Sequence, residues 1–276
     1  MTNWSRKRPD GYPGVCILRS RYDIHCGYSI SQNISPLECS KYYVLLTLII
    51  TKITLVIITM IITLGGIKGG SGKTTMATNL AIMRARDGHD VLLVDADAQE
   101  TATDFTYLRA QKFDGNPGYT AVRLAGRDVA TQLIRMESKF NDVIIDTAGR
   151  DSQGIRAAMA VSDLVLVPFV PRAFDVWTLE ETANVVSEMA QANRRLKGYT
   201  FINRADPRGH DNSEAADYLK EQATSLAHIP IMIGSRKAFA NAAREGLAVI
   251  ELKAQDPKAL EEITALYQAV FVQGNL

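Results

Sequence analysis

One stretch decides the fold of this chain: Lys68-Gly69-Gly70-Ser71-Gly72-Lys73-Thr74-Thr75. An apolar run, Met60–Leu64, precedes it, and a helical pattern, Met76–Arg86, follows it. A strand, a glycine-rich turn and a helix in this order make a phosphate-binding loop. The glycines let main-chain N–H groups approach the ligand, and the helix N-terminus favours negative charge. The spacing predicts that Lys73 reaches the β- and γ-phosphates of a nucleotide and that the Thr74 hydroxyl binds Mg²⁺.

The stretch departs from the common phosphate-loop pattern at two positions. Ile67 stands where the first glycine is expected, and a second lysine, Lys68, begins the loop. With these features it resembles the deviant Walker A box, K-G-G-x-G-K-T-T, of the ParA/MinD superfamily of ATPases. The resemblance implies that all eight residues contact the nucleotide, that ATP and Mg²⁺ are bound, and that Lys68 and Lys73 act in catalysis.

Two other apolar runs end in acids. Val91–Val94 leads into Asp95-Ala96-Asp97, and Val143–Ile145 leads into Asp146-Thr147-Ala148-Gly149. The carboxyl ends of parallel strands share one edge of a sheet, where ligands bind. The second run is a Walker B strand, with Asp146 placed to bind Mg²⁺ directly or through a water. The first resembles the family motif V-D-x-D-P-Q, with Ala98 for the proline, which implies that Asp97 positions the attacking water and Asp95 supports the metal shell.

A further strand, Tyr199–Asn203, ends in Asn203-Arg204-Ala205-Asp206. This run superficially matches the N-K-x-D guanine-reading motif of GTPases. Lys68 favours ATP instead, with Asn203 contacting the base, and guanine remains the alternative.

About seven short apolar strands alternate with helical patterns from Met60 onward. This alternation predicts an α/β fold with a mostly parallel, twisted sheet and helices on both faces, and the loop makes it a P-loop NTPase of the deviant Walker A type. Residues 60–276 are expected to form one ATPase domain. The helices expected after the first are Thr101–Lys112, Val129–Lys139, Phe174–Ala192, Asp211–Leu226, Ser235–Glu245 with Ser235 as its cap, and Pro257–Phe271.

Residues 1–59 differ from the rest of the chain. They carry a net charge of +4 and all three cysteines, whereas residues 60–276 carry −3, so no disulfide or thiolate metal site is expected beyond Cys39. By hydropathy Tyr42–Leu64 is a membrane-span candidate, but Lys52 interrupts it and its last residues must supply the strand before the loop. We favour an over-extended gene start with Met60 as the initiator. A membrane anchor within 42–59 and an extra structural element are the alternatives.

The resemblance covers 60–276 and points to short plasmid-partition ParA proteins of the ParF type. It implies an ATP-dependent homodimer in which Lys68 crosses to the other subunit's nucleotide. It also implies non-specific DNA binding and slow hydrolysis stimulated by a centromere-binding ParB- or ParG-like protein, in a cytoplasmic, nucleoid-associated setting. The net charge of −3 does not itself indicate DNA binding, and a local basic face would have to come from these residues: Arg204, Arg208, Arg236, Lys237 and Arg244.

Three other functions share the loop. A MinD-like membrane-positioned regulator needs a basic amphipathic C-terminal helix, which residues 269–276 do not supply. A bacterial tyrosine kinase needs a C-terminal tyrosine cluster, and Tyr267 stands alone. An accessory ATPase of conjugation has the same motifs and stays open.

Overall fold

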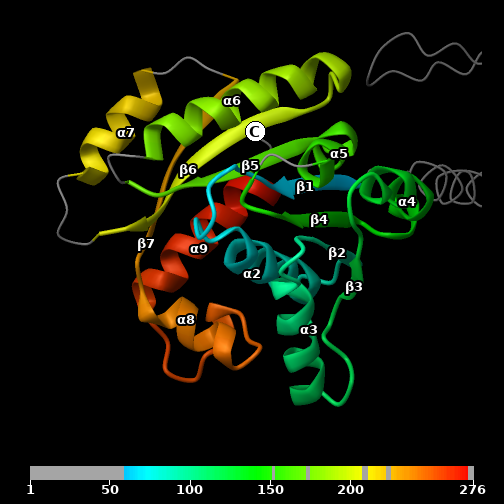
Figure 1. Cartoon of the computed structure of the whole chain (residues 1–276). Coiled ribbons are helices and arrows are strands. Elements are labelled where there is room, and N and C mark those ends of the chain that lie inside the picture. Colours follow the sequence, from blue (N-terminus) through cyan, green and yellow to red (C-terminus); the bar gives the residue numbers. More distant parts are fainter. Residues whose placement is uncertain (1–58, 151–152, 172–174, 207–210, 222–224, 273–276) are drawn as a thin grey trace, which may run out of the picture. The chain divides into compact units, whose positions relative to one another are not determined.

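The described residues form a seven-stranded sheet in which every strand pair is parallel. The computed structural model describes residues 59–150, 153–171, 175–206, 211–221 and 225–272. The strand order is β3-β2-β4-β1-β5-β6-β7 (Figure 1). The α/β fold with a parallel sheet is therefore confirmed. The strands are β1 Met60–Leu64, β2 Val91–Ala96, β3 Thr120–Arg123, β4 Asp142–Thr147, β5 Leu164–Phe169, β6 Lys197–Ala205 and β7 Leu226–Gly234.

Helices cover both faces of the sheet. One core cluster joins the sheet to α2, α3, α8 and α9, and two others join its opposite face to α4, α5, α6 and α7. The helix bounds are α2 Lys73–Arg86, α3 Thr101–Lys112, α4 Asp128–Met136, α5 Gln153–Val161, α6 Asp175–Ala192, α7 Asp211–Glu221, α8 Lys237–Arg244 and α9 Pro257–Phe271; the 3-10 turns are η1 Glu137–Lys139 and η2 Val249–Glu251.

Strand β1 is buried on both faces, as its continuous apolar sequence predicts. Ile62 and Leu64 pack toward α2 and α9, whereas Ile61 packs toward α4 and α5. Burying one such side chain contributes about 1.5–3 kcal/mol. The strand before the phosphate loop is therefore fixed in the middle of the sheet.

Several boundaries differ from the sequence prediction. The helix expected over Val129–Lys139 ends at Met136 in α4, and Glu137–Lys139 form the 3-10 turn η1. The helix expected to reach Leu226 ends at Glu221 in α7, and Leu226 is instead the first residue of β7. Ser235 does not cap α8, because Arg236 occupies the N-cap position with an extended backbone. The Ser235 N–H donates to the Ala205 carbonyl and so continues the strand edge.

The described part of the chain begins just before β1. The Thr59 hydroxyl donates to the carbonyls of Glu137 and Phe140, so this residue already contacts η1. The last five residues of the apolar run Tyr42–Leu64 form β1. The predictions for residues 1–58, the start site and the membrane anchor among them, lie outside the described residues. Within the described ranges, no helix is long and apolar enough to cross a membrane.

The topology brings the predicted motifs to one edge of the sheet. Strands β2 and β4 lie on one side of β1, and β5 and β6 lie on the other. The register pairs Leu64 with Asp146, and Asp146 with Asp95, so both acids stand in one row beside the end of β1. In a doubly wound sheet, ligands bind where the strand order changes direction.

Candidate functional site

A cavity of about 510 Å³ opens at this edge. It is walled by the loop after β1, the acidic loop after β2, the loop after β4 and the end of β6. The predicted site residues that line it are Gly69, Gly70, Gly72, Lys73, Thr74, Thr75 and Asp97. The structure thus brings together most of the phosphate loop and one of the acids.

Lys73 is 6% exposed, and its ammonium donates to the Lys68 carbonyl at 2.9 Å. Burial lowers the pKa of Lys73, and the carboxylates of Asp146 and Asp97 act in the opposite direction. The lysine that is expected to meet phosphates is therefore folded back on its own loop. It lies beside two acids and is withdrawn from water.

Asp146, at the end of β4, lies fully buried beside the cavity. Neither of its carboxylate oxygens has a hydrogen-bond partner of ordinary geometry among the described residues. Burial raises the pKa of Asp146 to about 7; the nearby Thr74 hydroxyl lowers it and the Asp95 charge raises it further. An unpaired buried carboxylate is costly unless a cation compensates it.

These residues fit Mg²⁺. Mg²⁺ is commonly held by one or two carboxylates together with the phosphates of a substrate, and not by an all-protein cage. The described residues contain no group of three or more His, Cys, Asp or Glu side chains that could hold a metal alone. The orphaned Asp146 oxygens and the adjacent Thr74 hydroxyl are the matching donors.

Asp95 is engaged elsewhere. Its Oδ2 accepts from the N–H of Thr103 at 2.7 Å and from the hydroxyl of the same residue at 2.8 Å, and its Oδ1 accepts from the Asp97 N–H at 3.1 Å. Asp95 therefore anchors the start of α3 and shapes the loop that carries Asp97. Asp97 accepts at Oδ1 from the Gln99 N–H, and this side chain reaches the cavity.

Glycine is required at two kinds of position in the loops. Gly70 and Gly72 have φ values of +73° and +96°, which other residues adopt only with strain. A Cβ on Gly149 would collide with the main chain of Gly69, so the loop after β4 lies directly against the phosphate loop. The main chain of Gly69 and Gly70 is otherwise open, since a Cβ there would meet nothing within 4 Å.

A second cavity, of about 220 Å³, lies between the loop and α8. Asn203 lines it, and its side-chain amide donates to the Ser71 carbonyl at 2.6 Å. Arg204 lines both cavities, has a left-handed φ of +55°, and donates to the Gly70 carbonyl at 2.8 Å. The end of β6 is thereby tied to the phosphate loop.

Lys68 contacts Lys73 through its carbonyl but is absent from the lining of the phosphate cavity. It lines a small cavity at the β5–α6 junction with Val170 and Leu179. Two cations that the sequence did not assign to phosphates do line the cavity: Arg150 and Arg204. The position of Arg150, directly after Gly149, is the signal that could have identified it.

The predicted basic face is reduced. Arg236 makes a two-point ion pair with Glu262, at 2.9 and 2.5 Å, and Arg204 bonds to the loop. Arg208 lies outside the described residues. Lys237 and Arg244 remain exposed on α8, seven residues apart and so on one side of the helix.

Comparison with known proteins gives a family match. The sequence model of the protein family described as "CobQ/CobB/MinD/ParA nucleotide binding domain" matches residues 62–249. Maintenance of carboxysome distribution protein A of Halothiobacillus neapolitanus is 25% identical over 209 residues, which cover 74% of this chain and 93% of the relative. Protein ParA of Rhizobium radiobacter is 25% identical over 215 residues, covering 74% of this chain and 92% of the relative.

Solved structures share the fold. The septum site-determining protein MinD of Pyrococcus horikoshii, complexed with Mg-ADP, superposes with a TM-score of 0.60 at 18% identity. The match covers 78% of this chain and 97% of the MinD chain. At this identity the likeness shows the fold alone.

Proposed function

The chain belongs to the CobQ/CobB/MinD/ParA nucleotide-binding family of P-loop ATPases, and we propose that it is a DNA-partition ATPase of the ParA type. The observation that carries the ATPase part of the proposal is the buried Asp146 carboxylate without a hydrogen-bond partner among the described residues, beside Lys73 and Thr74 at the phosphate loop. This arrangement suits a triphosphate with its divalent cation and little else, because an uncompensated charge would be costly there. The partition role is proposed from the relative named ParA.

The two cavities suggest how ATP binds. Its phosphates would lie against the open main chain of Gly69 and Gly70, with Lys73 turning from the Lys68 carbonyl to the phosphate oxygens. Its base would enter the second cavity, which Asn203 lines. Arg204 stands where the cavities meet and would lie near the sugar and the first phosphate.

The chemistry proposed is hydrolysis of the terminal phosphate. Bound Mg²⁺, held by Thr74 and Asp146, would neutralise phosphate charge. Asp97 would orient the attacking water, and Lys73 would stabilise charge on the phosphate oxygens. Asp95 would act indirectly, by holding the start of α3 and the Asp97 N–H in position through its carboxylate oxygens. A site that works by positioning turns over slowly until every group is in place.

We further propose that ATP binding drives formation of a homodimer. Lys68 is absent from the lining of its own phosphate cavity, although its carbonyl bonds to Lys73, and this supports a role of its side chain toward a second subunit's nucleotide. A lysine that meets phosphates only across the interface makes ATP binding and dimerisation one linked equilibrium. A centromere-binding partner of the ParB or ParG kind would then stimulate hydrolysis.

DNA binding is proposed for the dimer and would bring the protein to the nucleoid. Lys237 and Arg244, both exposed on α8, would supply phosphate contacts, and two subunits together would double them. With few phosphate contacts, binding would be weak and would fall steeply with salt. The relatives named for ParA and for carboxysome distribution leave two classes of cargo, DNA and a protein assembly.

A MinD-like membrane role finds less support. The apolar side of α9 is used inside the domain, where its buried residues are Ala259, Ile263, Leu266, Tyr267, Ala269 and Val270. Through Val272, the last described residue, no basic amphipathic helix is left to lie on a membrane.

Competition binding tests the proposed function. A fluorescent ATP analogue is bound in Mg²⁺ buffer and displaced with ATP or GTP, and phosphate release is followed in parallel. We expect displacement by ATP at lower concentration than by GTP, and slow phosphate release. Failure of ATP to displace the analogue would refute the proposal, and preference for GTP would restore the guanine alternative.

A further inference from the structure

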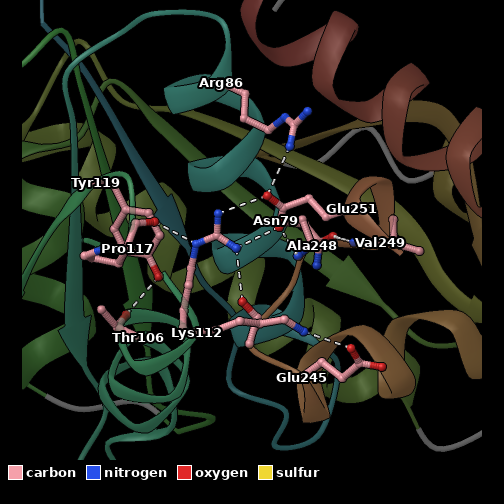
Figure 2. Close-up of polar contacts among 12 residues, drawn as sticks. Asn79, Arg86, Thr106, Lys112, Pro117, Tyr119, Glu245, Ala248, Val249 and Glu251 are labelled. Carbon is pink, nitrogen blue, oxygen red and sulfur yellow. Dashed lines mark hydrogen bonds and ion pairs between the residues drawn. The ribbon is translucent and has the colours of Figure 1, made fainter. Parts of the chain in front are cut away.

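Helix α3 is held to the rest of the domain by few contacts. It begins at Thr101, just after the loop that carries Asp97, and it has three buried residues in its 12: Ala102, Phe105 and Arg109. Tyr107 and Leu108 on its other side are 68% and 38% exposed. Its first half is anchored by two apolar side chains, whereas its last turns are held by a buried arginine and by a more exposed ion pair from Lys112 to Glu245 at 2.9 Å (Figure 2).

The buried arginine makes four hydrogen bonds to three partners. The Arg109 guanidinium donates to Glu251 at 2.7 and 3.0 Å, to the Gly246 carbonyl at 3.0 Å and to the Pro117 carbonyl at 2.6 Å. Both partners of the ion pair are more than nine-tenths buried. A lysine could not replace this planar, forked pattern of donors.

The partner lies on a junction segment, residues 245–251, that leads out of α8. Glu251 also accepts from the Ala248 N–H and from Arg86 of α2, and Val249 donates to Asn79 of α2 (Figure 2). Burial by itself would raise the pKa of Glu251, but the hydrogen bonds from Arg109, Ala248 and Arg86 outweigh it and hold the pKa below its usual value. The Glu251 carboxylate is thus charged, and both of its oxygens accept hydrogen bonds.

The junction segment touches three helices of the nucleotide site. Helix α2 begins in the phosphate loop, α8 walls the second cavity with Phe239 and Ala243, and α3 follows the acidic loop. Gly246 has a φ of +65°, and a Cβ there would lie 2.8 Å from the main-chain nitrogen of Arg109. The segment and α3 are therefore in direct main-chain contact. The close approach makes α3 dependent on this segment for its position.

We propose that the Arg109–Glu251 ion pair is a positioning contact, which fixes the far end of α3 to the junction segment and thereby holds Asp97 in place. The hydrolytic part of this inference rests on the proposed function. Because Asp95 binds Thr103 of α3 and the Asp97 N–H together, any tilt of α3 is passed to the acidic loop. Loss of the pair should therefore lower the rate of hydrolysis and leave the phosphate loop intact.

Amide hydrogen exchange of the nucleotide-free full chain tests the positioning directly. Glu251→Gln keeps the shape but removes the charge, and we expect exchange of the amides of residues 97–103 to rise about tenfold. Arg109→Lys is the second variant and should give the same local rise. Arg84→Met is the matched control, because Arg84 pairs with buried Asp142 at the start of β4, away from the site. It should leave residues 97–103 unchanged.

Two results would overturn the inference. One is faster exchange confined to residues 245–251, which would make the pair a local clamp. The other is an equal rise across the domain in the variants and the control, which would mean a general loss of stability. In Mg²⁺ and ATP, Glu251→Gln should lower kcat about tenfold without changing the Kd for ADP. If the wild-type chain hydrolyses no ATP, the proposed function fails, whereas the exchange rates still decide the positioning.

Discussion

The Lys73 ammonium donates a hydrogen bond of 2.9 Å to the main-chain carbonyl of Lys68, five residues earlier in the same loop. One lysine of the loop is thus held by the backbone of the other. Lys73 lies beside buried Asp146 and half-buried Asp97, while Lys68 lines the β5–α6 side. This division predicts separate roles, with Lys73 serving its own nucleotide and Lys68 serving assembly.

Lys73→Ala should abolish binding of ATP and of ADP. Among the described residues, Lys73 is the buried cation that interacts electrostatically with Asp146. Its ammonium is also placed to meet the phosphates. Calorimetric titration with each nucleotide in Mg²⁺ measures the effect, and Lys112→Ala on the far end of α3 is the control. ATP binding by Lys73→Ala with wild-type affinity would remove Lys73 from the site.

Asp97→Ala should bind ATP normally and hydrolyse it at least about 100-fold more slowly, as expected when a group that acts on the attacking water is lost. The exposed acid Asp104, in the first turn of α3, gives the control Asp104→Ala. Single-turnover phosphate release separates binding from chemistry. Hydrolysis at the wild-type rate would show that another group orients the water.

Asp146→Asn should stabilise the cation-free protein at neutral and higher pH. The folded-state pKa of Asp146 is about 7, above the ordinary 3.8, so the folded chain binds an extra proton between these pH values. Stability without a cation should therefore fall as pH rises from about 4 to about 7, by an amount on the order of 2–4 kcal/mol, and then level off. The variant should lack this fall.

Urea unfolding at about pH 5 and pH 8, with and without Mg²⁺ and ADP, measures both consequences. We expect wild type to gain stability from the ligands at pH 8 and the variant to gain much less. A wild-type curve that is flat with pH would contradict the burial of an unpaired charge at Asp146.

Asp95→Ala should destabilise the protein without any nucleotide present. Its oxygens accept three hydrogen bonds that hold the start of α3 and the Asp97 N–H, and loss of such a cap costs about 1–2 kcal/mol. Thermal unfolding of the apo protein shows this directly, with Asp104→Ala as the control. If apo stability is unchanged and only the Mg²⁺ dependence of binding is lost, Asp95 belongs to the metal shell as the sequence implied.

Periodicity and turn residues predicted much of the fold. Thr101–Lys112 and Pro257–Phe271 form helices with the expected bounds, and each is marked by its neighbours in the chain. Ser235 was misjudged as a cap, because pairing of its N–H with Ala205 extends the strand edge and overrides the local preference. A cap signal is local, whereas the competing bond joins residues 30 apart in sequence.

The site was predictable where its residues are consecutive and less so where they are distant. The loop and the acids are visible as short motifs at strand ends. The Arg109–Glu251 pair joins residues 142 apart, and neither has a motif around it, so only the folded chain reveals it. Likewise, a count of basic residues does not show that Arg236 is paired with Glu262. This ion pair removes Arg236 from the basic residues expected to contact DNA.

In the proposed mechanism, Lys68 joins ATP binding and dimerisation into one equilibrium. The most direct test is light scattering of wild type and Lys68→Ala in ATP and Mg²⁺, with a nucleotide titration of each at a concentration where both are monomers. A water-shielded contact between an ammonium and phosphate contributes roughly 2–3 kcal/mol, or about 30- to 150-fold in an equilibrium constant. We expect Lys68→Ala to weaken ATP-dependent dimerisation by this factor and to leave the monomer's affinity for ATP nearly intact. A variant that dimerises with ATP as readily as wild type would contradict this mechanism.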